Sequence, residues 1–351
     1  MIKRLHSASF IMFLFAGFLS ACSTANSNDA KPTIFEDIHY FATDPDASAA
    51  FFRKHFGARL MAHPGRPQDY VGFWALRSGE VPLTVSPIGP YKTTPPGSTF
   101  WSNKQIIPPS PDDNSYYGVY AVGVATPSLK EAVGKLTAEG VELSRQHISL
   151  PHEQDRPTQT IYGPDYNMFT LVERPDMRPG YRGFGIDHVH LLVRDKDETV
   201  KFYKDVFFGE EIWSNGNSAV LKIVDMLFIL SEPEALELDR TSVEERDYIK
   251  KVRYGVGHIG WLSTDMQAFI DHVDSTDYKF GVRPSRFYLQ GERTVYTLGL
   301  LLSPNVLSTE ILQEDGRHSA RTVFANSTDL PPPPTPGLQY HLTPEEYGAE
   351  K

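Results

Sequence analysis

Three side chains, far apart in the sequence, are of the types that bind a divalent metal ion. His188 and His258 each lie in an apolar run with the alternation of a β-strand, and Glu310 lies in a third such run. An unpaired carboxylate is costly to bury in an apolar strand, and a bound cation removes that cost. Two imidazoles and one carboxylate form the ligand set of a facial triad, which leaves coordination positions open. The sequence therefore predicts a metal site made of His188, His258 and Glu310.

Each of these residues also has a simpler interpretation. A strand histidine is often a half-buried residue that is bonded to a neighbour, and Glu310 can instead form an ion pair with an arginine. His190 shares a face with His188 and is a candidate to contact the substrate, or a packing residue. Tyr296 is a second candidate catalytic residue. His39 has no matching set of donors around it, so we expect it to be structural.

The elements that must position these side chains repeat four times along the chain. A β-like run is followed each time by an amphipathic helix with start and stop signals, and then by several short β-like runs. The acids Asp44, Asp195 and Asp265 precede three of the helices, and Thr126-Pro127 precedes the other. Each repeat is therefore a β-α-β-β-β module. The four leading strands are expected at residues 34–43, 117–125, 185–193 and 254–262.

Modules of this size cannot each close a core, so they should pair. We expect an α+β protein of two domains, 33–175 and 183–313, each a curved, mostly antiparallel sheet with flanking helices. The breaker-rich run at 174–180 is the expected linker. Residues 314–351 contain four consecutive prolines and are expected to be an extended tail.

Aligning the N-terminal pair of modules with the C-terminal pair shows which residues stand at the predicted ligand positions in each pair. The C-terminal pair of modules carries two histidines and a glutamate where the N-terminal pair carries Asp37, Ala121 and Thr170. We therefore expect the metal in the C-terminal domain and a metal-free N-terminal domain.

These motifs together resemble those of the vicinal oxygen chelate superfamily, which includes glyoxalase I, extradiol dioxygenases and antibiotic-resistance proteins. The resemblance covers residues 33–313. It depends on Asp187-His188-Val189-His190, on Gly257-His258-Ile259-Gly260, and on Ser303-Pro304-Asn305 leading to Glu310. By this resemblance His188, His258 and Glu310 would be the metal ligands.

The resemblance also implies an activity. Members of the glyoxalase type usually add a fourth protein ligand, and the run 226–231 offers no such side chain. Three ligands favour an Fe(II) dioxygenase that acts on a small chelating substrate, with aromatic compounds among the candidates. Mn(II), Zn(II) and Ni(II) are alternative metals. A lyase or isomerase that consumes no oxygen is the second hypothesis, and a small-molecule-binding protein without catalysis is the third.

The N-terminus has the features of a bacterial lipoprotein signal. Lys3 and Arg4 precede a short apolar run from Phe10 to Leu19, and Leu19-Ser20-Ala21 leads to Cys22, the only cysteine of the chain. We expect residues 1–22 to be a signal with a lipidated cysteine, 23–32 to be a tether, and the protein to lie at the outer membrane, facing the periplasm. A net charge of −10 argues against a nucleic-acid partner. A homo-oligomer is compatible with the sequence.

Overall fold

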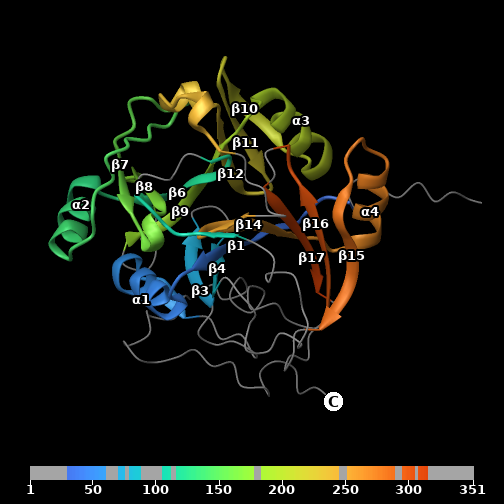
Figure 1. Cartoon of the computed structure of the whole chain (residues 1–351), viewed down its shortest axis with the longest axis horizontal. Coiled ribbons are helices and arrows are strands. Elements are labelled where there is room, and N and C mark those ends of the chain that lie inside the picture. Colours follow the sequence, from blue (N-terminus) through green and yellow to red (C-terminus); the bar gives the residue numbers. More distant parts are fainter. Residues whose placement is uncertain are drawn as a thin grey trace, which may run out of the picture.

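The fold consists of four modules whose strands join one curved, mixed sheet with helices against its outer side (Figure 1). The computed structural model describes residues 30–60, 70–75, 79–87, 105–111, 116–177, 183–244, 251–288, 295–304 and 307–314. The predicted signal, its Cys22, the tether up to residue 29 and the proline-rich tail lie outside these ranges. The α+β class is confirmed, and so is the β-α-β-β-β order of the first, third and fourth modules. In the second module an isolated bridge, Leu143 to Ile161, stands in place of one strand.

The first two modules occupy the N-terminal half of the chain. The first has β1 (Ile34–Ala42), α1 (Pro45–Phe56), β2 (Arg59–Leu60), β3 (Tyr70–Ala75) and β4 (Gly79–Pro87). A short strand, β5 (Gln105–Ile107), follows it. The second has β6 (Gly118–Thr126), α2 (Leu129–Ala138), β7 (Thr158–Tyr162) and β8 (Met168–Glu173).

The last two modules repeat this order. The third has β9 (Gly185–Leu192), α3 (Lys196–Phe207), β10 (Glu210–Ser214), β11 (Ser218–Ile223) and β12 (Met226–Ser231). The fourth has β14 (Gly255–Leu262), α4 (Met266–Asp274), β15 (Phe280–Tyr288), β16 (Val295–Leu302) and β17 (Ser308–Glu314). Just before it, β13 (Lys251–Arg253) pairs with β5.

The helices begin where the capping signals predict. The side chains of Asp44, Asp195 and Asp265 each accept a hydrogen bond from the backbone three residues later, and so cap α1, α3 and α4. For α2 the cap is Ser128, two residues beyond the Thr126 start signal. Each cap fixes the point at which the chain leaves a leading strand and crosses the outer side of the sheet.

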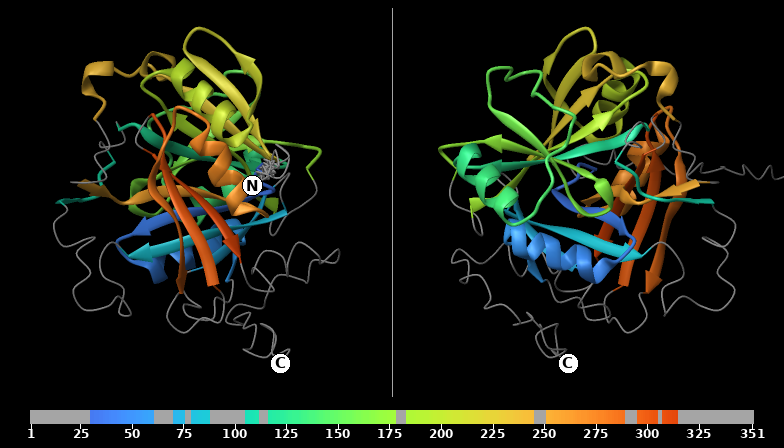
Figure 2. Two further views of the ribbon diagram at one scale, coloured as in Figure 1. Left: turned by 90° about the vertical axis from the view of Figure 1, so that its right-hand side faces the viewer. Right: turned by 60° about the vertical axis from the view of Figure 1, so that its left-hand side comes forward.

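The pairing of the modules differs from the expected pairing of neighbours. The first module joins the fourth, because β1 runs antiparallel to β14. The second joins the third, because β6 runs antiparallel to β9. Figure 2 shows the blue strands beside the orange and red ones, and the green strands beside the yellow-green ones. Within the sheet, β3 and β9 connect the two halves through the pair Ala75 and Ile186, and the main core extends across both halves. The residue ranges 33–175 and 183–313 remain a prediction about domains, but their modules do not pair internally.

The main core fixes which face of the sheet carries each side chain. Ile259 and Trp261 of β14 are fully buried, and the Trp261 ring packs 4.5 Å from the Phe207 ring of α3. Because side chains alternate along a strand, His258 and Gly260 face the other way, into the concave side of the sheet. The concave side of the half formed by the first and fourth modules therefore carries His258.

Candidate metal centre

Four potential ligands share the concave face of the half that pairs the first and fourth modules. Across β1, β14 and β17, the register places Asp37 opposite Gly260, and Gly260 opposite Glu310. In the next row His39 lies opposite His258. Three adjacent strands therefore bring two carboxylates and two imidazoles to one small area.

The donor atoms of this cluster are close enough to hold an ion together. Ligand atoms of Asp37, His39 and His258 all lie within 4.8 Å of one another. His258 Nε2 lies 2.6 Å from Glu310 Oε2, and the rings of His39 and His258 are 4.2 Å apart between centroids. Two donors bonded to one ion at about 2.1 Å each are at most about 4.2 Å apart. The atoms of Asp37, His39 and His258 are thus within about 0.6 Å of the spacing that one ion requires, and Glu310 adjoins this group through His258.

A missing side chain makes room for Asp37. A Cβ atom added to Gly260 would lie 2.5 Å from Asp37 Oδ1 and 3.7 Å from the Glu310 Cβ. The Asp37 carboxylate thus crosses over Gly260 toward Glu310. A register shift between Phe35 and Asp37 leaves Glu36 as an extra residue in β1. Such bulges turn side chains out of the regular alternation, and they occur often beside functional sites.

The burial of the cluster also fits a bound cation. Asp37 is 6% and Glu310 is 7% exposed, whereas His39 and His258 are partly open to solvent. Two nearly buried carboxylates within one cluster repel each other and lose hydration, and a divalent cation offsets both costs. Imidazole and carboxylate together suit Fe(II), Mn(II) and Zn(II). The chemistry of the donor set therefore matches a divalent metal.

The structure brings together only two of the three ligands predicted from the sequence. His258 and Glu310 lie in the cluster, but His188 lies in the other half, on β9 and opposite Gly123. Within the described part of the chain, no group of three close donors includes His188. Asp37 takes the place that was predicted for His188, because β14 pairs with β1 and not with β9. His39, expected to be structural, is within the donor cluster.

His188 is instead part of a buried polar network. Its Nδ1 lies 3.0 Å from Asp187 Oδ2, and Arg174 makes two hydrogen bonds to the same carboxylate. Burial alone would raise the pKa of Asp187, but the bonds from His188 and Arg174 hold it well below its usual range. In this half Ala121 and Thr170 stand where His258 and Glu310 stand in the other. The second half therefore has no counterpart of His258 or Glu310, which are two of the four donors in the first half.

His190, predicted as a catalytic contact, also lies in this second half. Its Nε2 is 2.9 Å from Ser231 Oγ, and the side chain is fully buried. Burial lowers the pKa of His190 to about 3, and the neighbouring His188 and His152 act in the same direction. The structure places Tyr296 on β16, opposite Glu314 and four residues from Leu300, the partner of Glu310. The catalytic roles of His190 and Tyr296 stay predictions.

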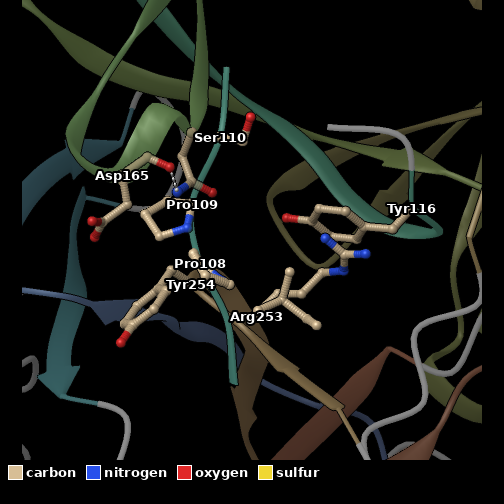
Figure 3. A pocket seen from close by; sticks show the side chains of 9 residues that line it. Pro108, Pro109, Ser110, Tyr116, Asp165, Arg253 and Tyr254 are labelled. Atoms are coloured by element: carbon tan, nitrogen blue, oxygen red, sulfur yellow. Dashed lines mark hydrogen bonds between the residues drawn. The ribbon is translucent and has the colours of Figure 1, made fainter. Parts of the chain in front are cut away.

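A small hollow lies near the start of β14, where β13 leads into it (Figure 3). Its lining includes Arg253, Tyr254 and Asp165, and its volume is about 10 Å³. This is about the space of a single water molecule. The hollow is therefore too small to be the substrate site.

Comparison with known proteins agrees with this fold. Residues 185–297 match the sequence model of the Glyoxalase/Bleomycin resistance protein/Dioxygenase superfamily. The fosfomycin resistance protein FosX of Listeria innocua is 26% identical over 115 residues, which are 32% of this chain and 79% of FosX. The matched superfamily segment contains His258, but neither Asp37 nor Glu310.

Solved structures extend the likeness to most of the chain. A glyoxalase I variant from Zea mays superposes with a TM-score of 0.54 at 16% identity, covering 80% of this chain and 92% of that one. A putative dioxygenase from Bacillus subtilis gives a TM-score of 0.50 at 14% identity, covering 81% and 86%. At these identities the likeness shows the fold alone. The family match, the FosX relatives and the shared fold together support a domain of this superfamily within the chain.

Proposed function

We propose that this protein is a metal-dependent enzyme that acts on a small substrate with two neighbouring oxygen atoms. The observation that carries the proposal is the cluster of Asp37, His39 and His258, with Glu310 2.6 Å from His258. A divalent ion held there would act as a Lewis acid and lower the pKa of a substrate group. The buried carboxylates hold the ion, while the partly open imidazoles border the side from which a substrate arrives.

Two kinds of reaction remain candidates within this class. The curated relatives are named for fosfomycin resistance, and structures of similar fold are named glyoxalase I and putative dioxygenase, so both kinds of reaction have a named counterpart. An Fe(II) dioxygenase, predicted from the sequence, requires that no more than three protein ligands hold the ion, so that substrate and dioxygen both find room. The count of protein ligands therefore separates the two reactions.

Metal analysis tests the proposed site. We expect about one divalent ion per purified chain, and a loss of at least tenfold in His258→Gln or Glu310→Gln. His188→Gln is the matched control, because His188 occupies the position in the other half that is equivalent to Asp37; it should keep its metal. If His188→Gln loses the metal and His258→Gln retains it, the proposed site is wrong.

We also propose that the protein is exported and anchored to a membrane through a lipid on Cys22. The short apolar run before this unique cysteine supports the proposal. None of the helices in the described part of the chain is long and apolar enough to cross a bilayer. Cys22→Ser should move the protein from the membrane fraction to the soluble fraction and abolish labelling with radioactive palmitate. Membrane association that persists without label would contradict the anchor.

A further inference from the structure

His39 has an unusual place beside the proposed metal centre. It follows Asp37 by two residues on β1, and the register places it directly opposite His258. One of its ring nitrogens belongs to the group of donor atoms that lie within 4.8 Å of one another. It therefore reaches the centre from the same strand as Asp37.

The local backbone explains why one strand supplies two donors. Register shifts occur on both sides of the segment, between Phe35 and Asp37 and between His39 and Tyr40. Each such irregularity bends the strand and increases its twist. The Asp37-Ile38-His39 segment is thus turned as a unit against β14. The Phe41 ring packs 5.0 Å from the His39 ring and 6.5 Å from the His258 ring, so it contacts both imidazoles.

The equivalent residue of the other half has a different environment. His190 occupies the same position of its module, yet its Nε2 is held by Ser231 and its side chain is fully buried. His39 is partly open and lies against another imidazole. The two histidines thus form a matched pair: one beside the donor cluster, and one outside any such cluster in the described residues.

We infer that His39 is a fourth protein ligand of the metal and that it thereby restricts the enzyme to chemistry without dioxygen. The inference rests on the proposed metal site. Asp37, His39, His258 and Glu310 would fill four of the six positions of an octahedral ion. A substrate that chelates through two oxygens fills the remaining two. No position is then left for a third small ligand, so the reaction is a proton transfer, addition or elimination on the chelated substrate.

X-ray absorption measures the ligand count directly. The full chain is loaded with Fe(II) without oxygen, and the number of imidazoles around the iron is determined. We expect two imidazoles in the wild type and in His190→Asn, and one in His39→Asn. A wild-type value of one, or an unchanged value in His39→Asn, would overturn the assignment of His39. If the wild type holds no iron or other divalent ion, the proposed metal site itself fails.

Nitric oxide, used as a stand-in for dioxygen, tests the consequence for reactivity. With Fe(II) in the site, nitric oxide gives a characteristic electron paramagnetic resonance signal, and oxalate serves as the bidentate probe. In the wild type and in His190→Asn, saturating oxalate should reduce this signal at least tenfold. In His39→Ala the signal should survive with oxalate bound, because a position has been vacated. Coexistence of both ligands in the wild type would contradict the inference and leave the proposed metal site standing.

Discussion

Gly260 is the residue on which the position of Asp37 depends. Asp37 Oδ1 lies only 2.5 Å from the position that a Cβ atom on Gly260 would take, which is too close for both atoms to fit. In Gly260→Ala the carboxylate must therefore move away from Glu310. We expect metal affinity to fall at least tenfold, about 1.4 kcal/mol. Titration with Mn(II) or Zn(II), followed by calorimetry, measures this change.

The other half supplies a control for this substitution. A Cβ added to Gly123 would lie 2.1 Å from His188 Cε1, so Gly123→Ala is crowded in the same way. It should cost about 1–3 kcal/mol of stability and leave metal affinity unchanged. If both variants lost metal affinity equally, the loss in Gly260→Ala would not come from the displacement of Asp37.

His190 gives the protein a predictable sensitivity to acid. Its pKa is lowered to about 3 in the folded state, whereas in the unfolded chain it titrates near its usual value. Below about pH 6.5 the unfolded state binds a proton that the folded state does not. Each pH unit then removes about 1.4 kcal/mol from the free energy of unfolding until the pH approaches 3.

Urea unfolding between pH 7.5 and 4.5 tests this linkage. His190→Gln cannot titrate and should show a shallower loss of stability over that interval than the wild type, even if it is less stable at pH 7.5. His39→Gln serves as the comparison. Parallel pH profiles of the wild type and His190→Gln would contradict a buried neutral imidazole.

At the scale of elements, the sequence predicts the modules well and their partners poorly. Capping acids and apolar periodicity are local signals, and they locate α1, α3 and α4 correctly. The pairing of strands is decided by contacts between distant segments. Glycines at positions 123 and 260 leave room for a side chain from another module. Asp37 and His188, which occupy this room, hold equivalent positions in the first and third modules. A glycine that leaves room and a side chain that fills it are compatible with pairing between modules adjacent in the sequence. They are equally compatible with the observed pairing.

The prediction of the site was limited by the same uncertainty about which modules pair. His258 and Glu310 belong to one module, so their proximity follows from the module itself and was predicted. The third and fourth donors come from whichever module pairs with it, and this was not predicted. Asp37 gave one usable signal: a carboxylate inside an apolar strand requires a partner.

Engineered disulfides can verify the observed pairing of β1. Ile34 lies opposite Leu262 in the register, and paired residues of antiparallel strands are close enough for a disulfide. In a Cys22→Ser background, Ile34→Cys with Leu262→Cys should cross-link on mild oxidation. Ile34→Cys with Ala125→Cys, the pair expected if β1 joined β6, should stay reduced. Mobility on a non-reducing gel distinguishes the two results.

For the whole molecule, a metal ion would join the first module to the fourth. Because it binds the folded state, it should raise stability by about 2.7 kcal/mol at a free concentration one hundred times the Kd. We expect the Tm of the wild type and of His188→Gln to rise on metal addition, and that of His258→Gln to stay constant. Calorimetric scans with and without a chelator measure this. A shift of equal size in His258→Gln would point to binding elsewhere.

The pairing of the first module with the fourth also sets an order of events during synthesis. β1 ends at Ala42, but β14 begins only at Gly255 and β17 only at Ser308. Chains are made from the N-terminus, and folding units form as they emerge. β6 and β9 can meet while the chain is still growing, whereas β1 has to wait for the last strands. A ribosome-bound chain is therefore unable to capture metal at this centre until almost all of it has been translated.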